Sequence, residues 1–536
     1  MIYISQFFFN THEKIRKIYL NSKVYDNKIS KVDDKDLIYK PSPYLLSSLI
    51  KYQKKKFKIE DFSLDRIWNN NELSQREFKK LNSFYWFFSL DLKSSKKDSQ
   101  SVITNWINNN YKYNFQSWDF DLVAKRIIAW LSCHNLTYEE SNQDYKNNFN
   151  KIIKKQTNHL IKEINRSKFI DDKLIGCAAI ILVGLCYQNE KDYLSFGLNT
   201  LKKISKFALD SSGFPKSRNI KHLIFYLKYF ILIKEWFKES QNTIPEHIEE
   251  AIYYLGQSYA FIWKKTESDL LFNGNNNSNN SDFDNYLKRL GYNFKNENHD
   301  FGGYILLKNK KICLAMDCGS TPNSKYTSDY QAGALSFEII TNGKKLISNC
   351  GYYKKNNLKL NELSKSTAAH NTLIIDDNSS SKFSKTNNFL SIKTGLKIIN
   401  KNSIFEKNYW KINASHDGYL KKYNSIHERE IEYYPEQMIF IGLDKIIKKK
   451  TNHNYKFDIR FHVEPQVKLM KTQDNKSILI ELEDQGWKFT CDNYDINIDN
   501  GLYFGNKNLY TENQNIFVTG ISNNQIENIK WKIEKI

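Results

Sequence analysis

Arg218 is the residue whose type and position most directly suggest a charged ligand. It is one of only nine arginines among 80 basic residues, and together with Asn219 it lies in a polar turn that follows Gly213. A guanidinium can hold a carboxylate or a sulfate group through two parallel hydrogen bonds. The alternative is that Arg218 forms a salt bridge that stabilises the loop, and the sequence leaves both interpretations open.

Three further residues could take part in chemistry. Asp329 and Gln331 follow a turn-rich stretch at residues 322–325, where the carboxyl group could transfer a proton and the amide could orient a substrate. His370 lies in the run STAAHNT at residues 366–372. It is either a residue of the site or a buried histidine whose ring hydrogen-bonds a neighbouring strand.

The length and composition exclude several classes of protein. A chain of 536 residues exceeds the usual size of a single core, so we expect two or three domains. Its 40% hydrophobic and 15% aromatic residues exclude a disordered chain. The sequence has no stretch of about 18 uncharged, apolar residues, so we expect no membrane-spanning segment.

The net charge of +21 comes mainly from lysine. Such a surface attracts acidic polymers in a salt-dependent way. A composition rich in Lys, Asn and Ile also fits an AT-rich coding bias, and we interpret most of the charge as background. The sequence has no zinc-finger spacing, no phosphate-binding loop and no RNA-binding aromatic motif, so we expect no nucleic-acid partner.

The cysteines and the N-terminus bear on the cellular compartment. Seven cysteines, an odd number with no CxxC pair, indicate buried free thiols. Residues 2–9 are apolar, but no basic segment precedes them and no small-residue cleavage site follows. We therefore expect a cytoplasmic protein, with the periplasm as the alternative.

The two halves of the chain have different patterns. The first half has apolar residues three and four positions apart, which predicts helices joined by short polar segments. These helices are expected at residues 81–92, 101–109, 119–131, 150–164, 173–187, 192–209, 221–239 and 245–264. Residues 273–285, NGNNNSNNSDFDN, have no periodicity and indicate a loop or a domain boundary.

The second half has short runs rich in Ile, Phe and Tyr, separated by turn residues every 8–15 positions. This pattern is typical of an antiparallel β-sandwich. Strands are expected at residues 303–307, 312–317, 334–340, 345–350, 371–376, 411–414, 428–434, 438–447, 457–463, 477–482, 487–491 and 515–520.

The second half has a series of short motifs: AGALSFE at residues 332–338, GKKLISNCG at 343–351, STAAHNT at 366–372, SHDGY at 415–419, HER at 427–429 and RFH at 460–462. In their order and spacing these motifs resemble the C-terminal β-domain of heparinase II/III-type polysaccharide lyases. The resemblance implies an N-terminal incomplete α/α toroid followed by a C-terminal antiparallel β-sandwich. It places an N-terminal extension at residues 1–60, the toroid at 61–268, an Asn-rich linker at 269–300 and the β-sandwich at 301–536.

The family cleaves acidic polysaccharides such as heparan sulfate or alginate by β-elimination. The reaction needs a base for the C5 proton of a uronic acid, a group that neutralises the carboxylate, and an acid for the leaving oxygen. The resemblance therefore implies a lyase whose partner is an acidic, uronate-containing polysaccharide. The alternative is a catalytically degenerate glycan-binding or envelope-associated protein of the same fold.

The sequence departs from the family at its metal site. Alignment on residues 335–337 places Asp329 and Gln331 where the family has two histidines, one of them catalytic and the other a zinc ligand. Asn349 stands at a second zinc position, and only His370 is retained. Since neutral amides are poor ligands for zinc, we predict no bound zinc.

The helical half departs as well, because no tyrosine stands where the family has its catalytic one. Tyr226 lies further along the next helix and is our candidate proton carrier. The predicted catalytic residues are His370, Asp329, Gln331 and Tyr226, and the predicted substrate-binding residues are Arg218, Asn219, Asn371, His416 and Arg429. The sequence leaves open which polymer is bound, whether cleavage is endo or exo, and the oligomeric state.

Overall fold

The computed structural model describes most of the chain. The described residues are 14–31, 36–47, 73–90, 96–187, 191–264, 266, 268–277, 281–354, 357–386, 389–449, 453–506 and 509–536. Much of the predicted N-terminal extension, residues 1–60, lies outside these ranges.

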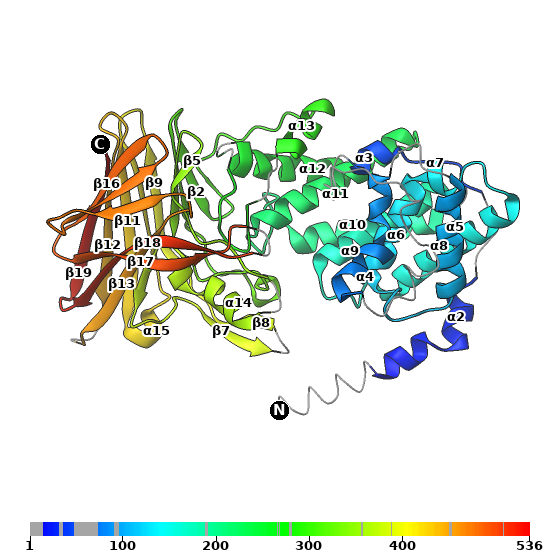
Figure 1. The fold of residues 1–536 in the computed structure, drawn as a ribbon, viewed down its shortest axis with the longest axis horizontal. Helices are drawn as coiled ribbons and strands as arrows, with labels where there is room; N and C mark the ends of the chain where they lie inside the picture. Colours follow the sequence, from blue (N-terminus) through cyan, green and yellow to red (C-terminus); the bar gives the residue numbers. More distant parts are fainter. Residues whose placement is uncertain are drawn as a thin grey trace. The chain divides into compact units, whose positions relative to one another are not determined.

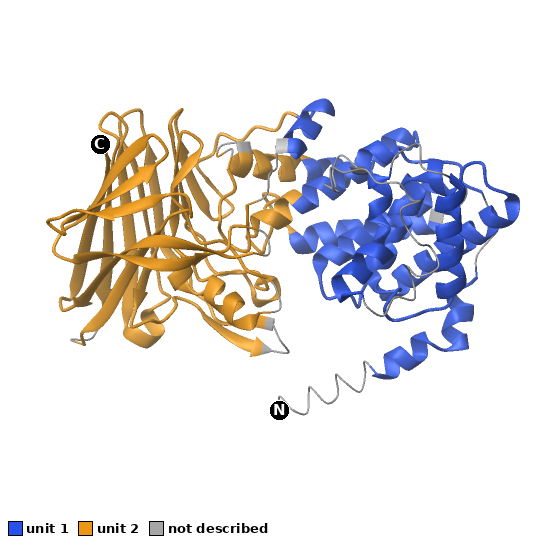
Figure 2. Cartoon of the chain, in the orientation of Figure 1, with its two compact units in different colours: residues 1–208, 225–252, 281–292 blue, residues 209–224, 253–280, 293–536 orange. Residues whose placement is uncertain are grey.

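Two compact units make up the chain (Figure 2). Unit 1 comprises residues 1–208, 225–252 and 281–292, and unit 2 comprises residues 209–224, 253–280 and 293–536. The segments of the two units alternate along the chain, whereas the predicted domains follow one another. Unit 2 therefore contains the polar turn with Arg218 and most of the Asn-rich segment in addition to the strands.

Unit 1 is helical (Figure 1). Its helices are α2 (Lys23–Ile29), α3 (Pro43–Ser47), α4 (Gln75–Ser83), α5 (Lys96–Asn110), α6 (Phe120–Ser132), α7 (His134–Thr137), α8 (Gln143–Glu163), α9 (Ile170–Cys186), α10 (Lys191–Ala208) and α13 (Ser281–Arg289). Helices α11 (Ile220–Glu239) and α12 (Glu246–Tyr259) contribute residues to both units.

The core of unit 1 is built on α6 and α9. From Leu174 to Cys186 every residue of α9 except Gly184 is buried, and the helix packs against α6 and α10. Large aromatic rings fill the space beside α6: Trp130 meets Trp106 edge to face at 5.5 Å and Phe84 at 5.1 Å between ring centroids. Edge-to-face pairs of this kind add to the stability that burial of the rings provides.

Unit 2 is built mainly of β-strands. They are β1 (Asp300–Phe301), β2 (Tyr304–Lys308), β3 (Ile312–Asp317), β4 (Phe337–Thr341), β5 (Lys344–Ile347), β6 (Leu373–Ile375), β7 (Lys382–Thr386), β8 (Phe389–Thr394), β9 (Ile398–Phe405), β10 (Trp410–His416), β11 (Ser425–Tyr434), β12 (Ile439–Lys448), β13 (Tyr455–His462), β14 (Lys468–Lys471), β15 (Ser477–Leu482), β16 (Gln485–Cys491), β17 (Asp495–Tyr503), β18 (Thr511–Ser522) and β19 (Ile526–Lys535). Two short helices, α14 (Leu358–Lys365) and α15 (Leu420–Tyr423), lie between strands.

The strands form three larger antiparallel sheets. One has the order β1-β2-β3-β4-β5, the second β14-β15-β16-β19-β12-β11-β10-β9, and the third β17-β18-β13-β6, while β7 and β8 form a hairpin. Side chains alternate between buried and half-buried along β11 and β12, as expected where one face of a sheet covers a core.

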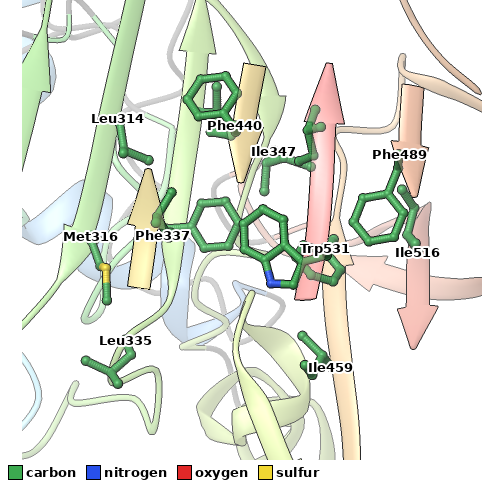
Figure 3. Packing of buried hydrophobic residues seen from close by; sticks show 14 of the residues in the cluster. Leu314, Met316, Leu335, Phe337, Ile347, Phe440, Ile459, Phe489, Ile516 and Trp531 are labelled. Carbon is green, nitrogen blue, oxygen red and sulfur yellow. The ribbon is translucent and has the colours of Figure 1, made fainter. Parts of the chain in front are cut away.

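The core of unit 2 lies among these sheets (Figure 3). The rings of Phe337 from β4 and Trp531 from β19 stack with 5.4 Å between centroids and 7° between planes. Phe489 from the neighbouring strand β16 and Phe461 from β13 of the third sheet pack against Trp531. Because these residues come from all three sheets, their packing joins the sheets into one hydrophobic core.

The predicted fold class is confirmed: a helical N-terminal region precedes an antiparallel β-sheet domain. Strands β3 and β15 have the predicted bounds. Within the Asn-rich segment, residues 273–277 form a loop of unit 2 in which Asn273, Asn275 and Asn276 are buried, while residues 281–285 begin helix α13 of unit 1, so a boundary between the units falls inside the segment. Residues 278–280 of that segment lie outside the described ranges.

Two smaller expectations concern the membrane and the thiols. Within the described ranges, no helix has the length and apolar character needed to cross a membrane. All seven cysteines are free and six are buried, as the sequence predicts. Burial raises the pKa of Cys318 and Cys350, the latter to about 12, so these thiols stay protonated.

The substitution Phe337→Ala tests the core. Phe337 is fully buried and stacked on Trp531, so we expect the free energy of unfolding to fall by about 3–5 kcal/mol. Denaturant unfolding of the full chain measures the change. The matched control is Ile521→Ala on β18, which is 56% exposed and should cost no more than about 0.5 kcal/mol. Equal effects of the two substitutions would contradict this account of the core.

Candidate active site

Asp329 is the centre of a cluster of polar side chains in unit 2. Its side chain is 7% exposed. The hydroxyl of Tyr352 donates to Oδ1 at 3.2 Å, and Nζ of Lys354 lies 3.2 Å from Oδ2. Asn219 donates from Nδ2 to Oδ2 at 3.3 Å, and Nε2 of His222 lies 3.5 Å from the same oxygen. The structure thus brings together Asp329 and Asn219, two predicted site residues, and adds three that were not predicted.

The start of α11 places Asn219 and His222 beside each other. Asn219 caps the helix, since its Oδ1 accepts a hydrogen bond from the backbone N–H of Lys221 at 2.8 Å. His222 follows in the first turn, and its Nδ1 lies 3.0 Å from Oγ of Ser217. The imidazole is therefore oriented at both nitrogens, by a hydroxyl on one side and by Asp329 on the other.

The charge of Asp329 is set by its neighbours. Burial by itself would raise the pKa of Asp329, but the hydrogen bond with His222 and the positive charge of Lys354 outweigh burial and hold that pKa well below its usual range. Burial and the charge of Asp329 raise the pKa of Tyr352 far above its usual value. At neutral pH the pair is thus a carboxylate that accepts from a protonated phenol.

Lys365 supports the segment that carries Asp329. It is 1% exposed, and its Nζ donates to the backbone oxygens of Ser328 at 2.5 Å and Leu390 at 3.2 Å. Burial lowers the pKa of Lys365 to about 8, although the charge of Asp329 opposes this. The lysine therefore acts through the backbone next to Asp329, at a position that no ligand can reach without rearrangement.

Arg218 is buried, and its guanidinium forms hydrogen bonds to other residues of unit 2. Nη2 donates to Oδ1 of Asp317 at 2.5 Å and to the backbone oxygen of Gly303 at 3.0 Å, and Nη1 donates to the oxygen of Gly319 at 3.0 Å. The ring of Tyr304 lies against the guanidinium, with 4.8 Å from Cζ to its centroid. These contacts are those of the loop-stabilising salt bridge, the alternative stated above, and contact of Arg218 with a substrate stays a prediction.

At the three positions where the family resemblance implies zinc ligands, Gln331 and Asn349 hydrogen-bond to backbone groups, and His370 is held by packing. Gln331 is 1% exposed, and its amide makes three hydrogen bonds to backbone groups. Oδ1 of Asn349 accepts from the backbone N–H of Asn371 at 2.9 Å. His370 is buried against Gly333, and neither ring nitrogen has a hydrogen-bond partner among the described residues. The predicted ring hydrogen bond to a neighbouring strand is therefore not found for His370.

His416 and Arg429 lie in the core of unit 2, in one buried polar chain. Nε2 of His416 is 3.2 Å from Nδ1 of His427, whose Nε2 is 2.7 Å from Oδ1 of Asp444. Arg429 donates to both oxygens of Asp444 at 2.8 and 3.0 Å, and it also donates to the backbone oxygens of Leu335 and Asn371. The chain thus ties the strands to the loops that carry Gln331 and His370.

The hydrogen bonds fix the tautomers of both histidines. Nδ1 of His416 accepts from the backbone N–H of Gly418, so the proton is on Nε2 and is donated to His427, which in turn donates to Asp444. Burial lowers the pKa of His416 and of His427, and both rings are neutral at pH 7. A contact of His416, Arg429 or Asn371 with substrate stays a prediction, since their described contacts lie within unit 2.

Tyr226 belongs to unit 1. It is 3% exposed and lies on α11 beside Phe225, with 6.1 Å between ring centroids. Its role as a proton carrier stays a prediction.

Sequence reasoning missed three residues of the cluster, His222, Tyr352 and Lys354, and also Lys365, which supports the segment that carries Asp329. His222 is 107 positions before Asp329, and only the fold brings the two together. Tyr352 and Lys354 follow directly after the motif at residues 343–351, which is the one signal that could have pointed to them. Lys365 resembles the many surface lysines of the chain, so nothing in its sequence context distinguishes it.

Comparison with known proteins agrees with the architecture. Residues 297–532 match the family described as heparinase II/III-like, C-terminal. Residues 297–532 are a heparinase II/III-like domain. The match confirms the family resemblance of the sequence motifs. No curated protein matches the sequence of this chain.

Solved structures of heparinases share the fold of the whole chain. A crystal structure of heparinase III has a TM-score of 0.69 at 15% identity and covers 96% of this chain and 85% of its own. A mutant heparan sulfate lyase from Pedobacter heparinus has a TM-score of 0.68 at 12% identity, with 97% and 88% coverage. A heparinase III with methylated lysines has a TM-score of 0.67 at 14% identity, with 96% and 84% coverage. At these identities the likeness shows the fold: a helical region followed by the heparinase II/III-like β-domain.

The substitution Arg218→Met separates the structural and substrate-binding roles of this residue. Its removal leaves the buried carboxylate of Asp317 without its cation, so we expect a loss of about 3–5 kcal/mol in the free energy of unfolding. The control is the double substitution Arg218→Met with Asp317→Asn, which should recover part of the loss. A single variant with wild-type stability but weaker binding of acidic polysaccharide would assign Arg218 to the ligand instead.

Acid titration tests the buried histidines of the heparinase II/III-like domain. Burial lowers the pKa of His370 to about 3 and that of His462 to about 4, both below the value of about 6.5 in an unfolded chain. The unfolded state therefore binds protons first, and stability that is complete above about pH 6.5 is lost as the pH falls toward 4. His370→Gln should reduce this slope by about 1.4 kcal/mol per pH unit in urea unfolding. The exposed His453→Gln is the control, and an equal change there would contradict the prediction.

Proposed function

We propose that this protein is a lyase that cleaves an acidic, uronate-containing polysaccharide by β-elimination. The heparinase II/III-like domain and the fold of solved heparinases support membership of a polysaccharide lyase family. The observation that carries the proposal for this chain is the cluster around Asp329, where a histidine, a tyrosine and a partly exposed lysine meet one buried carboxylate.

The cluster supplies the groups that β-elimination needs. With Nε2–H of His222 held by Asp329, the lone pair is on Nδ1, which leaves its contact with Ser217 and takes the C5 proton of the uronate; Asp329 stabilises the imidazolium that forms. Lys354, whose side chain is 60% exposed, neutralises the charge that grows on the uronate carboxylate. The electron pair of the C5–H bond becomes the C4–C5 double bond, the bond from C4 to the glycosidic oxygen breaks, and the imidazolium returns its proton to that oxygen. No metal is part of this sequence of steps.

Tyr352 and Asn219 hold Asp329 rather than react. Both donate hydrogen bonds to its carboxylate. Since these donors keep the carboxylate ionised, Asp329 is suited to stabilise a neighbouring positive charge and is a weak base itself. This assigns proton transfer to His222, with Asp329 as its partner.

A non-catalytic glycan-binding protein of the same fold is the second candidate. The observation that favours it is that several polar side chains predicted to contact substrate form their hydrogen bonds within unit 2 instead. The guanidinium of Arg218 is committed to Asp317, and amides stand at two positions of the metal site. A chain that binds acidic glycan without cleaving it would have these features too.

Absorbance of the unsaturated uronate product tests the proposal. The purified full chain is mixed with heparan sulfate, heparin, alginate and hyaluronan, and the ultraviolet absorbance is followed. We expect His222→Gln and Asp329→Asn each to lower the rate by about 100-fold or more, the usual loss when a proton-transferring group is removed. Lys354→Met should lower the rate as well, whereas the exposed Lys476→Met is its matched control and should keep the wild-type rate.

The outcomes separate the two candidates. Binding of a polymer in an affinity gel, with no growth of absorbance, would support the non-catalytic alternative. Full activity of Asp329→Asn would exclude the cluster as the site of the reaction.

A further inference from the structure

Gln331 joins three segments of unit 2 through one buried amide. Its Oε1 accepts from the backbone N–H of Gly274 at 2.8 Å, and its Nε2 donates to the backbone oxygens of Gly351 at 3.0 Å and Ser364 at 2.5 Å. Both N–H groups of the amide are used. The three partner segments are far apart in sequence, so this side chain acts as a cross-link between them.

The segment joined through Gly274 forms a wall of the Asp329 cluster. Gly274 has φ +86°, and a Cβ atom built on it would lie 2.6 Å from Nδ2 of Asn219 and 2.8 Å from Cβ of Asp329. The backbone at Gly274 therefore packs directly against both residues. The position of Gly274 is in turn set by Gln331, so the amide fixes the surroundings of Asp329 as well as the loops.

Zinc at this place would compete with these bonds. To coordinate a metal through Oε1, Gln331 would have to share that oxygen between the metal and the buried N–H of Gly274, and a neutral amide is already a poor ligand for zinc. Asn349 uses Oδ1 to accept from the backbone N–H of Asn371. Among the described residues no three histidine, cysteine or carboxylate side chains are grouped so that they could hold a metal. The residues present do not fit the zinc site that the family resemblance implies.

We propose that Gln331 is a metal-free clamp that takes the place of zinc in this chain and positions Asp329. Hydrogen bonds to three backbone groups do what coordination bonds would do, namely hold separate loops at fixed distances. His370, the one retained position, keeps its place by packing on Gly333 instead of by ligation. The inference does not rest on the proposed activity, because metal content, stability and the carboxyl ¹³C signal of Asp329 all report on it.

The first experiment measures metal and stability in the wild-type chain. We expect elemental analysis of the purified protein to find no stoichiometric zinc and the Tm to be unchanged by EDTA or by added zinc. Stoichiometric zinc, or a Tm that falls on chelation, would overturn the proposal.

The second experiment removes the clamp. Gln331→Ala should lower the Tm by about 3 °C or more, since it leaves one buried N–H and two buried carbonyl groups without partners. It should also shift the carboxyl ¹³C signal of Asp329 at neutral pH, because the backbone at Gly274 that packs on Asp329 would no longer be held; the signal is assigned by its loss in Asp329→Asn. Gln485→Ala is the control, because Gln485 is a buried amide of β16 that bonds Thr341. It should leave the Asp329 signal unchanged, and an unchanged signal in Gln331→Ala would contradict the positioning role.

The third experiment restores the family pattern. The double substitution Gln331→His with Asn349→Asp restores a histidine and a carboxylate at the two positions that the family resemblance implies as zinc ligands, in addition to the retained His370. We expect this variant to gain a Tm that rises with added zinc, a response that the wild type lacks. A double variant that does not respond to zinc would contradict the claim that the amide stands in the place of the metal.

Discussion

A carboxylate that is removed from water needs hydrogen-bond donors and positive charge around it, and three such carboxylates determine how the loops of unit 2 are arranged. Asp317 is matched by Arg218, Asp444 by Arg429 and His427, and Asp329 by its polar cluster. The cost of burying an unpaired charge is several kcal/mol, so each loop must bring its donor to the carboxylate. The turn with Arg218 and the segment with Asp329 are thus placed by electrostatics as much as by packing.

Amide side chains also hold the loops of unit 2 in place, through hydrogen bonds to carboxylate, hydroxyl and backbone groups. In the Asn-rich segment, Asn273 donates to Oδ2 of Asp317 and to the hydroxyl of Tyr304, and Asn276 donates to the backbone oxygens of Tyr352 and Phe504. An amide both donates and accepts, which suits it to join backbone groups of neighbouring loops. The segment predicted as an Asn-rich linker therefore holds loops of unit 2 together over residues 273–277. Gln331 joins backbone groups in the same way, at a position where the family resemblance implies a zinc ligand.

The fold could be predicted from the sequence, while the site could be predicted only in part. Apolar spacing identified α6, α9, β3 and β15, because each buries a regular face that periodicity records. Strand β9 was missed because its side chains are mostly exposed or half-buried and carry no such pattern. In the candidate site, the family alignment led to Asp329 and the polar turn after Gly213 led to Asn219, but His222 and Lys365 come from segments that only tertiary structure brings near. The roles of Arg218 and Arg429 depend on burial, which the residue type does not reveal.

The exposures within the Asp329 cluster indicate how a ligand and a proton could be linked. Lys354 is 60% exposed, whereas the side chains of His222 and Asp329 are 12% and 7% exposed, so an anionic ligand meets the ammonium group first. Lys354 is also one of the groups that lower the pKa of Asp329. A uronate carboxylate that pairs with Lys354 weakens this effect, and the pKa of Asp329 then rises. By linkage, the Asp329 carboxylate then stabilises a protonated His222 more strongly when the substrate is bound. In the proposed reaction, Lys354 therefore both holds the substrate and makes His222 a stronger base.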